Sequence, residues 1–305
     1  MKLIKQFSVL GVSLILAGLV PASAMDSPPR VRQAPRPEPG RPERPRSKTG
    51  CPEGIQQRTS ASLNFSALLG KGSYGEVHRA SLGGETVAVK VLTGEFDRPR
   101  LLAEFRTQQQ AGEKGVAPRV IGDSYFCIPD YPETGPVLAF SMELVENAQT
   151  LEGAVEGMNA LSTSERNERI QALARQTFGK LGDLHGVGIS HRDLAPSNIL
   201  VTAGLDGGPG AVYIIDYGLG TSSVGHAQYH VAEMLTAKYE DMDFVALTLI
   251  YLEALGQVET SERNLTIDDL VDVVDSLSDL NDFRSLVLGR LNDIKNFFKK
   301  KRKTS

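Results

Sequence analysis

The sequence predicts an α+β protein whose first part is mainly strands and whose second part is mainly helices. Short runs rich in apolar and β-branched residues, separated by glycine clusters, are typical of an antiparallel meander. The expected strands are 65–69, 76–81, 85–92, 120–128 and 136–144. A helix over 98–111 interrupts them, because Leu101 and Phe105 fall on one face of such a helix. The first part is therefore expected to be a five-stranded antiparallel sheet with one helix.

After Val145 the spacing of the apolar residues becomes helical. The expected helices are 150–161, 165–184, 239–255 and 268–298. Two short strands, 198–201 and 211–215, are expected on either side of the glycine-rich turn 204–210. The second part is therefore expected to be mainly helical.

Composition excludes several classes of protein. The chain has 305 residues, of which 41% are hydrophobic, so it is not a wholly disordered chain. A formal net charge of −4 gives no global basic field for nonspecific nucleic-acid binding. Two cysteines exclude a disulfide-dense scaffold and a four-thiolate zinc site. At most Cys51 and Cys127 form one disulfide, and the sequence does not decide whether they pair.

The amino terminus has the pattern of a secretory signal peptide over residues 1–24. Two lysines precede a fourteen-residue apolar run, Phe7 to Val20, and Ala22-Ser23-Ala24 then offers the small residues that a signal peptidase needs. A membrane span needs about twenty apolar residues, so we favour cleavage over an uncleaved signal anchor. We expect a secreted protein with no transmembrane span in the mature chain, acting in the secretory pathway or inside a host cell.

Residues 25–61 are expected to form a disordered, proline- and arginine-rich linker. Eight prolines lie between Ser27 and Pro52, and such a segment does not bury a core. The expected divisions are a signal peptide 1–24, the linker 25–61, a first lobe 62–146, a second lobe 147–298 and a basic tail 299–305.

Four short motifs carry the chemistry, and the first is a glycine-rich stretch between two expected strands. Gly70, Gly72 and Gly75 form a GxGxxGxV pattern that ends at Val77. Glycines allow backbone amides to approach phosphate oxygens closely. A dinucleotide-binding fingerprint would open a helix, whereas a strand follows here. Taken alone, the stretch is equally a hairpin turn.

The second motif is a lysine within an apolar strand. Lys90 ends the run Val87-Ala88-Val89-Lys90, and a buried lysine needs a carboxylate partner. Glu104, near the middle of the expected helix, can supply it, which leaves the ammonium to hold the α and β phosphates of a nucleotide. Two alternatives are open. Lys90 could reach solvent from a strand edge, or Glu113 could be its carboxylate partner in place of Glu104.

The third motif lies directly before the strand at 198–201. Asp193 can accept or orient a hydroxyl proton, and Asn198, five residues later, can bind Mg²⁺ through its amide oxygen. His191 is interpreted as a packed structural residue, and Arg192 could meet a phosphorylated residue in the loop that follows.

The fourth motif is Asp216, which leaves an apolar strand and enters the glycine turn at Gly218. A carboxylate in that position suits a Mg²⁺ ion that bridges the β and γ phosphates.

In this order, the four motifs resemble the eukaryotic-like protein kinase superfamily over roughly residues 62–299. The resemblance implies a bilobal kinase fold that uses ATP and Mg²⁺. The catalytic residues that it implies are Asp193, Lys90 and Glu104. The implied nucleotide contacts are Gly70, Gly72, Gly75, Val77, Lys90, Glu143 and Val145, of which the last two belong to a hinge that reads adenine. The implied metal ligands are Asn198 and Asp216.

The sequence departs from the family pattern near the catalytic aspartate. Ala195 and Ser197 stand where serine/threonine kinases carry a lysine and tyrosine kinases an arginine. Asp216 lies only 27 residues before Asp243, so the activation segment is short. Residues 239–247 are similar to the helix start of the small atypical kinases of tRNA threonylcarbamoylation, which suggests a reduced carboxyl lobe.

We expect an enzyme that transfers the γ-phosphoryl group of ATP to a serine or threonine hydroxyl of a protein, because Pro196 departs from the tyrosine-kinase pattern. The alternatives are a secreted pseudokinase that binds nucleotide or a partner without turnover, and a kinase for a small-molecule or RNA-linked substrate. The sequence does not identify the protein substrate. Apart from the basic run Lys299 to Lys303, which is a signal for acidic lipid or nucleic acid or simply a solvated tail, no strong nucleic-acid signal is present.

Overall fold

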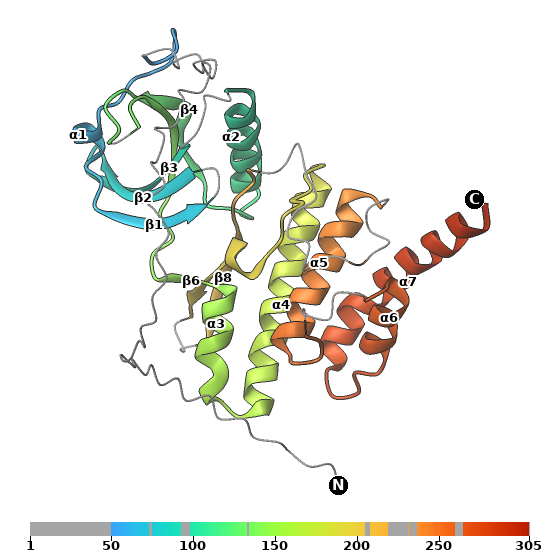
Figure 1. The fold of residues 1–305 in the computed structure, drawn as a ribbon. Coiled ribbons are helices and arrows are strands. Elements are labelled where there is room, and N and C mark those ends of the chain that lie inside the picture. Colours follow the sequence, from blue (N-terminus) through green and yellow to red (C-terminus); the bar gives the residue numbers. More distant parts are fainter. Residues whose placement is uncertain are drawn as a thin grey trace, which may run out of the picture. The chain divides into compact units, whose positions relative to one another are not determined.

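A five-stranded antiparallel sheet forms the first lobe of the protein, in the strand order β1-β2-β3-β5-β4 (Figure 1). The computed structural model describes residues 50–72, 75–92, 98–132, 134–204, 208–218, 231, 237–259 and 265–304. The strands are β1 (Ala67–Gly72), β2 (Gly75–Leu82), β3 (Glu85–Leu92), β4 (Val120–Ile128) and β5 (Val137–Glu143). The helix α2 (Arg98–Glu113) follows β3 in the chain. The expected sheet with one helix is therefore confirmed.

The two faces of this sheet carry different clusters, because successive side chains of a strand point to opposite faces. Val87, Val89 and Val91 of β3 belong to one buried cluster. Ala88 belongs to the other cluster, which also contains Leu101 and Phe105 of α2. Lys90 shares the parity of Ala88, so its side chain emerges on the face that α2 covers. The alternation within β3 therefore directs the lysine toward the helix.

The segment before β1 is ordered on the sheet from residue 50. Cys51 forms a disulfide with Cys127 of β4, which settles the pairing that the sequence left open. The short helix α1 (Ser60–Leu63) is capped by the Thr59 side chain, and Leu63 is fully buried. The folded domain therefore begins before Ser62, in contrast to the linker boundary expected there. The signal peptide and the rest of the linker, residues 1–49, lie outside the described residues.

The second lobe is mainly helical, as expected, and contains one small sheet (Figure 1). Its helices are α3 (Leu151–Gly157), α4 (Thr163–Gly186), α5 (Tyr239–Ala254), α6 (Ile267–Asp275) and α7 (Asn281–Thr304). The small sheet consists of β6 (Ala148–Thr150), β7 (Ile199–Ala203) and β8 (Pro209–Ile214). The sequence analysis did not predict β6, which is only three residues long.

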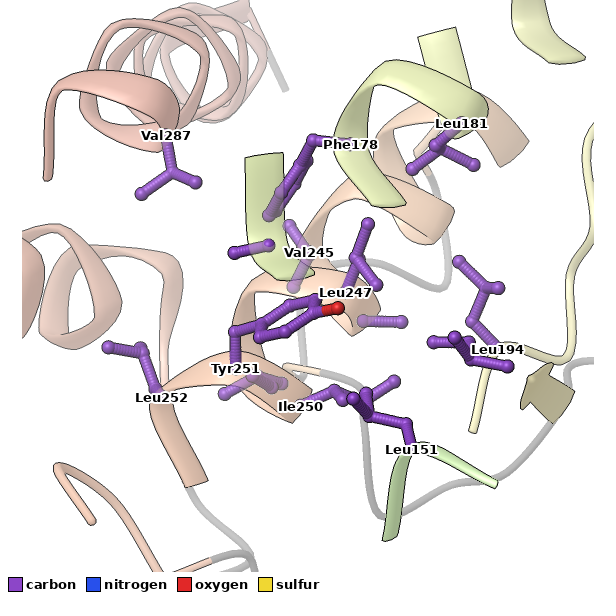
Figure 2. Packing of buried hydrophobic residues seen from close by; sticks show 14 of the residues in the cluster. Leu151, Phe178, Leu181, Leu194, Val245, Leu247, Ile250, Tyr251, Leu252 and Val287 are labelled. Carbon is purple, nitrogen blue, oxygen red and sulfur yellow. The ribbon is translucent and has the colours of Figure 1, made fainter. Parts of the chain in front are cut away.

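The core of this lobe surrounds α5 (Figure 2). This helix is buried along most of its length, and Tyr251 near its end is fully buried. The Tyr251 hydroxyl lies 2.6 Å from Thr177 Oγ1 of α4, which satisfies both buried groups. Phe178 packs against Tyr251, with ring centroids 6.2 Å apart. This core fixes the position of α5, and α5 in turn holds the loop that precedes β7.

The carboxyl-terminal region differs from the expected helix over 268–298. It consists of α6 and α7, which pack against each other, with the buried residues Leu277 and Leu280 in the turn between them. The basic run that we expected to form a tail belongs to α7, which continues to Thr304. Basic residues at the carboxyl end of a helix interact favourably with its dipole. Among the described helices, none is both long and apolar enough to cross a membrane.

Candidate active site

The ammonium of Lys90 is the centre of the site. Lys90 Nζ donates to Asp216 Oδ1 at 2.7 Å and also forms an ion pair with Glu104 Oε1. The side chains of Lys90 and Glu104 are 10% and 3% exposed, whereas that of Asp216 is 42% exposed. The predicted pair of Lys90 with Glu104 is therefore present, and Glu113 is not the partner. The second carboxylate on Lys90 is a contact that the sequence did not indicate.

Lys90 and Asp216 each favour the charged form of the other. Burial acts to lower the pKa of Lys90, but the adjacent carboxylates Glu104 and Asp216 outweigh it, and the net shift is upward. Burial acts to raise the pKa of Asp216, but the Lys90 ammonium outweighs it, and the net shift is downward. Lys90 and Asp216 therefore stabilise each other's charge at the inner face of the sheet.

The glycine-rich loop joins β1 to β2 above this cluster. A Cβ on Gly75 would lie 2.3 Å from the carbonyl oxygen of Val91, so only glycine fits where β2 passes β3. A Cβ on Gly72 would lie 4.0 Å from Asp216 Oδ2, which places the loop backbone beside the carboxylate. A Cβ on Gly70 would meet nothing within 4 Å. A side chain at position 75 would therefore clash with β3, and a side chain at position 72 would lie beside the Asp216 carboxylate.

The loop that contains Asp193 and Asn198, here called the catalytic loop, is hydrogen-bonded to the segment after β8 that carries Asp216. The Asn198 side-chain amide donates to the carbonyl oxygen of Asp193 at 2.9 Å. The backbone N–H of Ile215 donates to the carbonyl oxygen of Asn198, also at 2.9 Å. Asp193, Asn198 and Asp216, which the sequence placed in two separate motifs, are therefore brought into one site.

His191 is a structural residue, as the sequence analysis interpreted it. It is fully buried, and its Nε2 lies 2.8 Å from the carbonyl oxygen of Ile215. Its Nδ1 accepts from the backbone N–H of Asp193 at 3.3 Å. A neutral ring with its proton on Nε2 satisfies both contacts. His191 thus ties the catalytic loop to the segment before Asp216.

Asp243 at the start of α5 anchors the same loop, and the sequence analysis missed this role. Its carboxylate accepts from the backbone N–H groups of His191 and Arg192, both at 2.7 Å, and is 1% exposed. Arg192 has φ 68°, a conformation that costs a non-glycine residue about 1–3 kcal/mol. The two hydrogen bonds offset that cost. Because Asp243 lies at the acidic start of α5, close to Glu240 and Asp241, the sequence did not single it out.

The Arg192 guanidinium lies over the ring of Tyr239, 3.7 Å from its centroid. This contact is a cation–π interaction with the first residue of α5. The sequence analysis suggested that Arg192 meets a phosphorylated residue after Gly218. Residues 219–230 and 232–236, where such a residue would be, lie outside the described residues.

The expected hinge, which contains Glu143 and Val145, overlaps the end of β5. The backbone N–H of Glu143 donates to the carbonyl oxygen of Arg119 at 2.8 Å, and its side chain pairs with the Arg119 guanidinium at 2.6 Å. These contacts hold the Glu143 backbone at the end of β5. No contact between Val145 or Val77 and a nucleotide is established here, so both residues remain predictions.

Comparisons with known proteins identify the family of the domain. The family model of the protein kinase domain matches residues 63–249. The chain belongs to the protein kinase family. The kinase is 31% identical over 163 residues to "Serine/threonine-protein kinase PknH" of Mycobacterium bovis, which covers 51% of this chain and 24% of that protein.

Other relatives give a similar picture. The kinase is 29% identical over 154 residues to "Serine/threonine-protein kinase PknD" of Mycobacterium tuberculosis, covering 50% of this chain and 21% of the relative. It is 30% identical over 164 residues to "CBL-interacting protein kinase 20" of Oryza sativa subsp. japonica, covering 51% and 33%. The chain therefore spans only a fifth to a third of the length of these relatives.

The charged cluster predicts a specific loss of stability in acid. Because the pKa of Asp216 is lowered in the folded protein, its contribution to the free energy of unfolding is present above its ordinary pKa of 3.8 and is lost as the pH falls. We expect the stability difference between the wild type and Asp216→Asn to be constant from about pH 5 to 9 and to shrink below about pH 4. Urea unfolding, followed by circular dichroism at each pH, measures this stability difference. The exposed Asp123, replaced by Asn, is the control, and an Asp216→Asn difference that stays flat into acid would contradict the assignment.

Proposed function

We propose that the kinase transfers the γ-phosphoryl group of ATP to a serine or threonine hydroxyl of a protein. The observation that carries the proposal is the linkage of Lys90, Asp193, Asn198 and Asp216 through side-chain contacts and one backbone hydrogen bond, from Ile215 to Asn198. Members of the family use these residue types for phosphoryl transfer. The relatives named as serine/threonine-protein kinases support the choice of acceptor, although they match over only part of their length.

The described residues fit ATP and Mg²⁺. At Gly72 the backbone lies beside the Asp216 carboxylate, and the absence of a side chain there leaves this backbone open to a phosphate chain. Asn198 uses its amide nitrogen on Asp193, so its amide oxygen is the atom that can ligate a cation. That oxygen and the Asp216 carboxylate are the hard ligands that Mg²⁺ prefers. When bound, Mg²⁺ would supply positive charge to the phosphates, and we assign its binding to these two residues.

Each residue then has a definite role in the proposed transfer. Asp193 orients the acceptor hydroxyl and takes its proton as the hydroxyl oxygen forms a bond to the γ-phosphorus. The bond from that phosphorus to the β–γ bridging oxygen breaks, and ADP leaves. Lys90, fixed by Glu104, holds the α and β phosphates. The acceleration comes mainly from positioning and charge neutralisation.

A pseudokinase is the second candidate, favoured by one observation. Ala195 is 3% exposed and packs in the core of the second lobe, where the family's lysine would stand. Neither Ala195 nor Ser197 offers the γ-phosphate a cation. In a protein that turns over ATP, Lys90 and the metal would have to supply that charge.

Substitution of the catalytic aspartate separates the two candidates. Asp193→Asn keeps the shape of the side chain but removes the base, so we expect turnover to fall by about two to four orders of magnitude while nucleotide binding is retained. Label transfer from γ-labelled ATP to protein acceptors measures turnover, and titration with ATP measures binding. A wild type that binds ATP but transfers no more label than Asp193→Asn, to proteins, small molecules or RNA, would contradict the proposal and favour the pseudokinase.

We also propose that the protein is exported with cleavage before Met25. The support is the sequence pattern at residues 1–24, namely the lysines, the apolar run and the small residues up to Ala24. Amino-terminal sequencing of the secreted protein should begin at Met25. Secreted protein that begins at Met1 would contradict cleavage and favour a signal anchor.

A further inference from the structure

We propose that residues 50–58 form a strap that positions α2, and with it Glu104, against Lys90. The placement of α2 is a property of the fold, whereas its consequence for phosphate transfer rests on the proposed function. The strap lies outside the kinase-domain match, which begins at residue 63. Three sets of contacts carry the inference.

The strap is fastened to β4 both covalently and through its backbone. Besides the Cys51–Cys127 disulfide, the backbone N–H of Cys127 donates to the carbonyl oxygen of Gln56 at 2.8 Å. The backbone N–H of Arg58 donates to the carbonyl oxygen of Cys127 at 2.9 Å. One residue of β4 thus holds the strap at both ends, and the Arg58 guanidinium lies over the Phe126 ring, 5.2 Å from its centroid.

The inner side of the strap packs on the cluster that contains α2. Cys51 and Ile55 are half-buried against this cluster, which includes Leu101 and Phe105 of the helix. The cluster also contains Cys127, which is fully buried. The strap therefore covers the same face of the sheet as α2.

Phe105 transmits this packing to Glu104, its neighbour in the chain. The Phe105 ring packs edge-on against Phe140 of β5 and Tyr125 of β4, with centroids 5.8 and 6.1 Å away. Tyr125 is two residues from Cys127, so the ring sits beside the point where the strap is fastened. If the strap left, Phe105 would lose part of its apolar cover and α2 could rotate or move outward.

The composition of α2 gives such an external support a role. Among its described residues, Leu101 and Phe105 are buried in the apolar cluster on this face, whereas Arg106, Gln110 and Glu113 are exposed, so few apolar contacts hold the helix to the sheet. The Lys90 ammonium is buried and pairs with Glu104 and Asp216. If Glu104 moved away, Asp216 would be the one carboxylate left beside it among the described residues. The disulfide counteracts fraying, because a chain segment near a terminus otherwise detaches readily.

Amide hydrogen exchange of the full-length protein tests the strap without depending on catalysis. We expect Cys51→Ser and Ile55→Ala to speed the exchange of the α2 amides by about tenfold or more, while α4 in the second lobe is unchanged. Leu63→Ala is the matched control, because Leu63 is a fully buried residue of the same amino-terminal segment but packs on the opposite face of the sheet. Glu53→Ala, an exposed position in the strap, should leave all exchange unchanged.

The comparison among these variants decides the proposal. If α2 exchanges no faster in Cys51→Ser and Ile55→Ala than in Leu63→Ala, the strap contributes only to general stability and the proposal is wrong. A companion assay relates it to function, since a displaced Glu104 should raise the KM for ATP in both strap variants and not in Glu53→Ala. If the wild type transfers no phosphate, the proposed function fails, and the exchange comparison still decides the strap.

Discussion

The buried ammonium of Lys90 is the constraint on which the rest of the site depends. A charge at the inner face of an apolar sheet is costly unless carboxylates neutralise it. Glu104 reaches it from α2, and Asp216 reaches it from the segment after β8. The Lys90 side chain thus connects β3, α2 and that segment. The requirement to neutralise Lys90 therefore selects the placement of the helix and of the Asp216 carboxylate together.

The second lobe meets this constraint through a rigid support. The buried helix α5 presents Asp243, which fixes the backbone of the catalytic loop, and His191 joins that loop to the strand leading to Asp216. These are hydrogen bonds between buried groups, which are lost only at a high cost. The first lobe has a less extensive support, since α2 is largely polar and the strap supplies part of its cover. The two lobes thus hold the site by different means.

Sequence patterns predicted the features that depend on neighbouring residues in the chain. The alternation in β3 indicated the sheet and directed Lys90 inward, and the spacing from Asp193 to Asn198 indicated two residues that a hydrogen bond joins. Features that depend on distant partners were missed. Asp243 acts on a loop about fifty residues earlier in the chain, and no local pattern marks that role. The prolines of the expected linker led us to predict disorder up to residue 61. The disulfide of Cys51 instead orders the last part of that segment. The break between α6 and α7 contains no glycine or proline, and the apolar spacing continues through it.

Lys90 is shared between Glu104 and Asp216, and if Asp216 held Mg²⁺ as proposed, the Lys90 ammonium would be free to pair with phosphate. Calorimetric titration with ATP, with and without Mg²⁺, on the wild type, Asp216→Asn and Lys90→Met tests it most directly. The account predicts that Asp216→Asn binds metal-free ATP at least as tightly as the wild type, because Lys90 loses a competing carboxylate, but gains nothing from Mg²⁺. Lys90→Met should bind more weakly in both conditions. If Asp216→Asn weakens metal-free binding as much as Lys90→Met does, the two residues act as one structural unit and the claim is wrong.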